Sequence, residues 1–210
     1  MAALASLSGL LGLSFASGVN LYAVVLVVGL GVRFHWLSGL PAELAPLGHP
    51  GVLITAAALY AIEFVADKIP FVSAAWDTIH TLVRPFGAVL MALTAASQLG
   101  PVEQTIAGLV GGAVALSSHA AKMGIRLLAH GTGEPFTQAG LSVVEDAFAV
   151  TLVLLAAQYP YVALAVVVFL LIVIACLLPL LWKAIRTMLR AVARWFGSGS
   201  SRGSSPIIRT

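Results

Sequence analysis

Six ionisable side chains crowd between residues 63 and 85 of a chain that is 60% hydrophobic and only 9% charged. They include three of its eight acidic residues and are Glu63, Asp67, Lys68, Asp77, His80 and Arg84. An ionisable group near hydrocarbon is costly unless it is paired, hydrated or close to a membrane surface. Such a set could line a path for an ion, hold a phosphate or bind a metal. A function is therefore sought first in this stretch.

A second polar group lies later in the chain, where His119, Lys122, Arg126 and His130 recur every three or four residues. This spacing places them on one helix face. The acids Glu134, Glu145 and Asp146 follow. We expect the two polar groups to meet, with acids offsetting bases across a helical bundle. Such a belt could equally be structural and only position the helices, although Glu145 has no opposite charge beside it in sequence.

Asn20 follows Ser17-Gly18 inside an otherwise apolar segment. A polar break there could expose main-chain groups to an ion, or could only permit tight helix packing. Twelve residues are therefore candidates for a substrate or ion path. They are Asn20 and eleven residues from the two polar groups: Glu63, Asp67, Lys68, Asp77, His80, Arg84, His119, Lys122, Arg126, Glu145 and Asp146.

Enzyme and metal chemistry are less well supported by the motifs. Arg84-Pro85 with the later Ser118-His119 is similar to two pieces of a membrane phosphatase signature, but the piece that should carry the nucleophile is missing. Carboxylates and His80 could ligate a divalent ion, yet neighbouring Lys68 and Arg84 would repel it. We expect no cofactor and no metal, and no catalytic residue is assigned.

Composition predicts an all-α polytopic membrane protein. The mean hydropathy is +1.03, and apolar runs of roughly 20 residues match about 30 Å of hydrocarbon. Six spans are predicted: 4–32, 51–65, 86–99, 105–116 or beyond, 141–158 and 162–181, with a short interfacial helix at 72–83. We expect one transmembrane domain over residues 1–196 and a disordered Gly/Ser-rich tail over 197–210. The basic residues form no patch with interleaved aromatics, so nucleic acid is not an expected partner.

Orientation follows from the positive-inside rule. Lys183, Arg186, Arg190 and Arg194 follow the last span, which predicts a cytoplasmic C-terminus and, with six spans, a cytoplasmic N-terminus. This basic segment should contact anionic lipid headgroups. The expected location is the inner membrane of a bacterium, and a homo-oligomer is compatible with the sequence.

A weak internal repeat is also predicted. Gly9 to Gly12 can be laid on Gly108 to Gly111, and Glu63 then falls opposite Glu145. Two halves of three spans each would be inverted in the membrane, as in many transporters.

Several motifs occur in an order that resembles a known family. They are Ala66-Asp67-Lys68-Ile69-Pro70, Trp76-Asp77-Thr78-Ile79-His80-Thr81, Arg84-Pro85, Ser118-His119-Ala120-Ala121-Lys122, Glu134-Pro135-Phe136 and Glu145-Asp146. Over residues 9 to 160 the chain resembles the bacterial membrane proteins of the domain-of-unknown-function family 4126. It departs from that pattern at Val72 and at Thr137-Gln138. The resemblance implies a fold class but no activity, substrate or cofactor.

The leading functional hypothesis is a small transporter or channel. In it, Glu63, Asp67, His119 and Glu145 line a polar path, and the bases attract an anionic solute or a lipid headgroup. Two alternatives stay open. One is a membrane enzyme that acts on a phospholipid or a phosphate ester, and the other is a scaffold in which Glu63 and Glu145 face a subunit interface.

Overall fold

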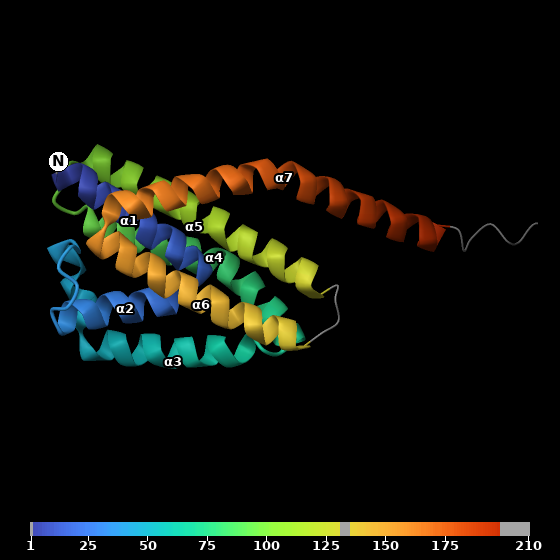
Figure 1. The fold of residues 1–210 in the computed structure, drawn as a ribbon, viewed down its shortest axis with the longest axis horizontal. Coiled ribbons are helices and arrows are strands. Elements are labelled where there is room, and N and C mark those ends of the chain that lie inside the picture. Colours follow the sequence, from blue (N-terminus) through green and yellow to red (C-terminus); the bar gives the residue numbers. More distant parts are fainter. Residues whose placement is uncertain (1, 131–134, 198–210) are drawn as a thin grey trace, which may run out of the picture. The chain divides into compact units, whose positions relative to one another are not determined.

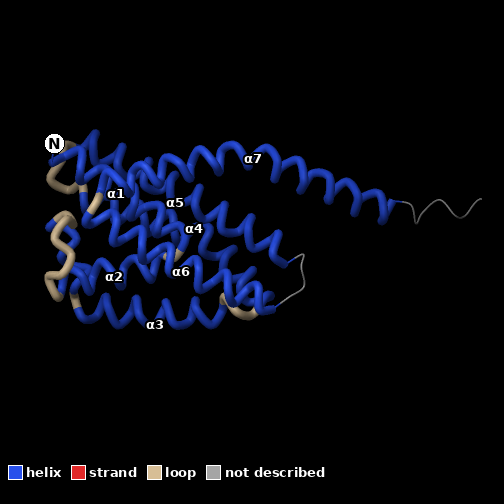
Figure 2. The backbone as a smooth tube through the Cα atoms, viewed as in Figure 1, coloured by secondary structure: helices blue, strands red, loops and turns tan. Residues whose placement is uncertain are grey.

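The structure is a computed structural model that describes residues 2–130 and 135–197, and its regular structure over these ranges is helical throughout (Figures 1 and 2). The helices are α1 (Ala2–Val19), α2 (Leu21–Arg33), the 3-10 helix η1 (Ala42–Gly48), α3 (Pro50–Ala66), α4 (Pro70–Ala95), α5 (Pro101–His130), α6 (Pro135–Gln158) and α7 (Pro160–Gly197). The all-α prediction is confirmed for the described residues. The predicted disordered tail lies almost entirely outside them.

Proline residues mark where the later helices begin. Pro50, Pro70, Pro101, Pro135 and Pro160 are each the first residue of a helix. The fixed φ of proline suits the first helical position, and its missing N–H is not needed there. Local sequence therefore fixes five helix starts.

The predicted separation of an interfacial helix at 72–83 from a span at 86–99 is wrong. Both belong to α4, which continues through Pro85. The charges at Asp77, His80 and Arg84 suggested a membrane surface, but all three side chains are buried in the protein. Because the bundle supplies their partners, the helix does not have to leave the membrane at this point.

The predicted first span is interrupted at Asn20 and doubles back. Asn20 is extended, with φ −150° and ψ 99°. A Cβ at Gly9 on α1 would contact the main-chain O of Ala156, and one at Gly39, soon after α2, would overlap that of Ala157. A straight helix over residues 9–33 would be about 36 Å long and would hold these positions far apart. Figure 1 shows α2 running back toward the end of the bundle where α1 begins.

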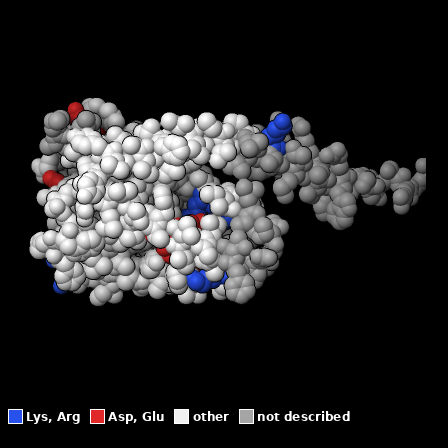
Figure 3. All heavy atoms as spheres, in the orientation of Figure 1, with Lys and Arg blue, Asp and Glu red and all other residues white. Residues whose placement is uncertain are grey.

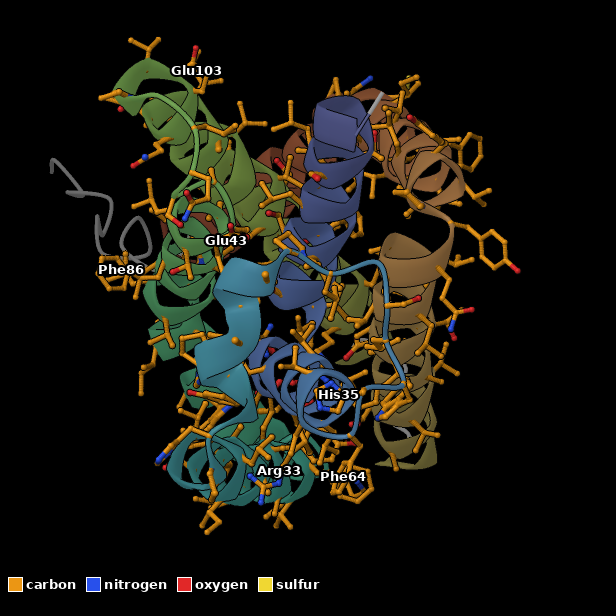
Figure 4. All side chains as sticks on the ribbon, turned by 90° about the vertical axis from the view of Figure 1, so that its left-hand side faces the viewer. Arg33, His35, Glu43, Phe64, Phe86 and Glu103 are labelled. Carbon is orange, nitrogen blue, oxygen red and sulfur yellow. The ribbon has the colours of Figure 1, made fainter. Side chains whose placement is uncertain are left out.

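The helices α1 and α2 thus form a hairpin with its tip at Asn20, and α1 packs against α4, α5 and α6. Small residues permit the close approach: beyond Gly9, a Cβ at Gly12 would touch Ala156 and Ala163. Figure 4 looks at the end where α1 begins, and shows Arg33, His35, Glu43 and Glu103 there. The residues at the hairpin tip are therefore deep in the bundle rather than at either end.

Several segments of the described residues are long and apolar enough to cross a membrane. Four pass by length and composition, and with the bent pair of η1 and α3 there are five: Ala5–Arg33, Ala42–Ala66, Val72–Ala95, Ala139–Gln158 and Pro160–Leu177. The predicted six spans and the inverted repeat are not confirmed. In particular, α5 is continuous where the repeat would align it with the broken α1–α2 pair.

Polarity is distributed in the manner of an integral membrane protein. Large apolar side chains such as Ile54, Leu82 and Leu109 are exposed, whereas most of the described charged side chains are buried. Soluble proteins place charge on the surface instead. Figure 3 shows only a few charged atoms on an otherwise uncharged surface. The chain also divides into two units, residues 1–171 and 172–210, and all of the candidate site belongs to the first.

Candidate functional site

Arg84, on α4, joins three helices at the middle of the bundle. Its side chain is fully buried, and its Nη2 lies 2.7 Å from Oε1 of Glu63 on α3. The same Nη2 lies 3.6 Å from Oδ1 of Asp77, two turns earlier on α4. Nη1 donates to the main-chain O of Gly18, 3.3 Å away, near the C-terminal end of α1. Arg84 therefore ties the hairpin to α3 and α4.

The protonation of His119 follows from its contact with Arg84. Nδ1 of His119 lies 2.7 Å from Nη1 of Arg84. A guanidinium group only donates, so Nδ1 must accept and cannot carry a proton. The imidazole is therefore neutral with its proton on Nε2, which lies 3.1 Å from the main-chain O of Asp77 and 3.2 Å from Oγ1 of Thr81.

Arg126, on α5, binds two carboxylates from other helices. It forms a bidentate pair with Asp67, with Nη1–Oδ1 and Nη2–Oδ2 distances of 2.7 and 2.6 Å. Its Nη2 is also 2.5 Å from Oε2 of Glu145 on α6. Asp67 directly follows α3. Burial alone would raise the pKa of Asp67, but the hydrogen bonds from Arg126 and the charges of Lys122, Arg126 and Arg84 outweigh it and lower that pKa.

Lys122, one turn before Arg126, lies among three carboxylates. Its Nζ is 3.2 Å from Glu145 Oε2, 3.6 Å from Asp67 Oδ2 and 3.7 Å from Glu63 Oε1. It also donates to the main-chain O of Val19, the last residue of α1, over 2.9 Å. Two cations thus meet the last carbonyl groups of α1, where the helix dipole is negative.

At the start of α2, the hairpin tip is bound through Asn20, a side chain without charge. The side-chain O of Asn20 caps α2 by accepting from the N–H of Ala23 over 2.9 Å. Its Nδ2 donates to Oδ1 of Asp146 on α6 over 2.8 Å. Oδ2 of Asp146 accepts from the hydroxyl of Tyr60 on α3 over 3.0 Å. Asn20 therefore connects the hairpin tip to Asp146, a carboxylate that takes no part in the salt bridges among the described residues.

Charge does not balance within this cluster. We call Glu63, Asp67, Asp77, Arg84, Lys122, Arg126 and Glu145 the ion-pair network, since salt bridges connect all seven. It contains four carboxylates and three bases, and Asp146 beside it is a fifth buried carboxylate. Within the described residues no three His, Cys, Asp or Glu side chains are placed to hold a metal ion.

Eleven of the twelve candidate residues from the sequence are buried, and Lys68 is the half-buried exception. Nζ of Lys68 bonds the main-chain O of Phe64 and lies over its ring, away from the ion-pair network. His80 is buried beside the network rather than in it: it stacks on Trp76 and lies 2.9 Å from the hydroxyl of Tyr22. The side chains of His130 and Glu134 fall outside the described residues.

Sequence reasoning missed the partners that carry no charge. Tyr60, Tyr22 and Thr81 each bond a candidate residue, and the carbonyl groups of Gly18 and Val19 accept from the bases. Tyr60 precedes Glu63 by three residues on one helix face, which was a usable signal. The sequence gives no such signal for the carbonyl groups of Gly18 and Val19, because they become available as acceptors only where the helix breaks between α1 and α2.

Comparison with known proteins supports the resemblance seen in the motifs. The family model for the domain of unknown function 4126 matches residues 7–180. No curated protein and no solved structure matched the chain in the same comparisons. The matched segment includes every residue of the ion-pair network, and the chain belongs to the family defined by the domain of unknown function 4126.

Proposed function

We propose that the protein is a small membrane transporter or channel whose path passes the ion-pair network, and that it carries a cation or a proton rather than an anion. The observation that carries this proposal is the α1–α2 hairpin, which ends in the interior on a buried cluster with more acids than bases. Broken helices that present main-chain groups and charged side chains at depth are how many transporters build their sites.

Preference for a cation comes from how the bases are used. Arg84, Lys122 and Arg126 each contact at least two carboxylates. An anionic solute or a lipid headgroup would have to displace those carboxylates in a site that already has excess negative charge. A cation or a proton would offset that excess instead.

The enzyme alternative has one geometric candidate, the pair of Thr81 and His119. Oγ1 of Thr81 lies 3.2 Å from Nε2 of His119, which is the distance expected of a nucleophile and its base. The base would need a free lone pair on Nε2. Because Nδ1 accepts from Arg84, Nε2 holds the ring proton and cannot remove one from Thr81. We therefore favour transport over hydrolysis.

The scaffold alternative would place Glu63 and Glu145 at a subunit interface. Glu63 is 0% exposed and Glu145 only 9% exposed within a single chain. Both contact bases of their own chain. Their burial therefore has an explanation that needs no second subunit.

For the membrane location we propose the bacterial cytoplasmic membrane. If Lys68, at the end of α3, is cytoplasmic by the positive-inside rule, the hairpin places the first turns of α1 on the outer side together with the 34–49 loop. This replaces the expectation of a cytoplasmic N-terminus, since an interrupted segment that returns to its own side is not a crossing.

Flux measurements test the proposal. Purified protein is reconstituted into liposomes that contain a pH-sensitive dye. Proton entry is recorded under an imposed pH gradient, and charge movement is recorded under an imposed potassium gradient. We expect ion entry above that of empty liposomes, and a loss of at least tenfold in Glu145→Gln, because Glu145 is the most exposed carboxylate of the network. Glu103→Gln, at an exposed position in the first turn of α5, is the matched control and should conduct normally. Unchanged flux in Glu145→Gln would remove Glu145 from the path, and no flux of either kind would refute the proposal.

A further inference from the structure

Three polar atoms without hydrogen-bond partners gather around one guanidinium group. They are Oε2 of Glu63, Oδ1 of Asp77 and Nε of Arg84, and all three are buried. Nη2 of Arg84 lies 2.7 Å from Oε1 of Glu63 and 3.6 Å from Oδ1 of Asp77. Buried polar atoms in native proteins nearly always have a partner. Each of the two carboxylates that face Arg84 therefore has one buried oxygen that accepts no hydrogen bond.

Asp77 has the weakest ion pairs in the network. Its closest contacts with bases are 3.4 Å to Arg126 and 3.6 Å to Arg84. Each of the other three carboxylates has a base within 2.7 Å: Arg84 for Glu63, and Arg126 for both Asp67 and Glu145. The network has one more carboxylate than it has bases, and Asp77 is the carboxylate that is paired least closely with a base.

Resting on the proposed function, we propose that Asp77 is the site of an exchangeable proton. The proton binds at Oδ1 of Asp77, a buried acceptor that receives no hydrogen bond. An O–H bond forms at Oδ1, the proton comes from a hydronium ion that leaves as water, and the net charge of the network changes from −1 to 0. The coupling ion of the transporter is then the proton.

Groups on every neighbouring helix act on this site. They are Glu63 on α3 and Asp67 just after it, His119, Lys122 and Arg126 on α5, Glu145 on α6, and His80 and Arg84 on α4 itself, with Tyr22 on α2 reaching the site through His80. Asp67 and Glu145 compete with Asp77 for Arg126, as Glu63 competes for Arg84. Neutral His119 adds no positive charge. Asp77 therefore has the longest ion pairs of the four carboxylates in the network.

Asp146 is the rival site, and its geometry is different. Both of its oxygens already accept hydrogen bonds, one from Asn20 and one from Tyr60. Donors on both oxygens favour the ionised carboxylate. A proton on Asp146 would have to displace one of these donors, whereas a proton on Asp77 would occupy an atom that has none.

Infrared spectroscopy of the protein in lipid near neutral pH tests the site without any transport assay. We expect the C=O stretch of one protonated carboxylic acid, and we expect a heavy carbon isotope in the aspartate carboxyl groups to shift it. Asp77→Asn should abolish the band entirely and Asp146→Asn, the matched control, should keep it. If Asp77→Asn does not fold, Asp77→Glu keeps an acid at the site, and its band should no longer respond to labelled aspartate.

Each outcome decides a different claim. Absence of the band in the wild-type protein, or its loss in Asp146→Asn with retention in Asp77→Asn, would overturn the proton site. A band at Asp77 in a protein whose liposomes conduct no ions would leave the proton site standing and refute transport. Proton entry without any protonated carboxyl band would refute the proton site and leave the transport proposal standing.

Discussion

Asn20 and Asp146, 126 positions apart in the chain, are joined by a 2.8 Å hydrogen bond at the tip of the α1–α2 hairpin. One amide group caps α2 with its oxygen and binds α6 with its nitrogen. The side chain of Asn20 therefore both stabilises the break in the first apolar segment and supplies a hydrogen-bond donor to the buried carboxylate of Asp146.

Replacing Asn20 tests this relationship directly. Asn20→Ala removes the cap, at about 1 kcal/mol, and leaves buried Asp146 with one donor fewer, at about 1–3 kcal/mol. We expect a clearly lower melting temperature for the detergent-purified protein. Gln158→Ala, which truncates an exposed amide at the end of α6, should melt like the wild type. Equal melting temperatures for Asn20→Ala and the wild type would show that the tip needs no cap.

Gly18 should not tolerate a side chain. A Cβ there would overlap Oγ of Ser118 and the main-chain O of Ala115. Gly18→Ala should force α1 and α5 apart and destabilise the protein by about 1–3 kcal/mol. Gly140→Ala adds a methyl group to α6 where nothing lies within 4 Å, and should be neutral or stabilising by up to about 1 kcal/mol. Thermal unfolding that ranks the two variants in the opposite order would contradict the hairpin packing.

Acid should remove the contribution of Asp67. Its pKa in the folded protein is lowered, so the stability it provides is fully present above its unfolded pKa of about 3.9 and declines as pH falls through the lower folded value. We expect Asp67→Asn to be less stable than the wild type near neutral pH. The gap in melting temperature should narrow below about pH 4. A gap that stays constant or widens in acid would mean that the pair with Arg126 does not hold the carboxylate ionised.

Replacing Lys122 should destabilise the protein more than replacing Lys68, although Lys68 is next to Asp67 in sequence and Lys122 is close to Asp67 in space. Lys122→Gln leaves carboxylates on three sides without their buried base, and removal of one partner from a buried pair costs about 3–5 kcal/mol. Lys68→Gln removes only a half-buried cation over Phe64, which contributes about 1 kcal/mol or less. Chemical unfolding of both variants gives the comparison. A smaller loss for Lys122→Gln than for Lys68→Gln would contradict the network.

The hairpin also predicts which segments share a side of the membrane. With Cys176 changed to Ser, single cysteines at the exposed positions Ser6, Ser38 and Glu103 and at the half-buried position Lys68 can be labelled in intact cells with a membrane-impermeant maleimide. We expect the first three to react alike and Lys68→Cys to react oppositely. Matching behaviour of Ser6→Cys and Lys68→Cys would mean that the first segment crosses.

The sequence by itself determined the class of the protein and its helix starts. Composition favours a membrane protein, because apolar runs of about 20 residues match the hydrocarbon thickness of a bilayer. Five prolines begin five helices, because proline loses no hydrogen bond at the first helical position. The periodic spacing of His119, Lys122 and Arg126 also predicts that they share one face, and the attraction between acids and bases predicts that this face meets the acids of residues 63–77.

Only the tertiary structure decided where the charges lie and how the first segment runs. Periodicity cannot distinguish a charged face at the membrane surface from one buried against acids of another helix, so α4 was wrongly divided near Arg84. Nor can a single asparagine reveal that the chain reverses at it, since the reversal depends on Asp146, Arg84 and Lys122 binding the exposed helix ends. The surplus of one carboxylate in the network likewise emerges only when distances show which acids already hold a base.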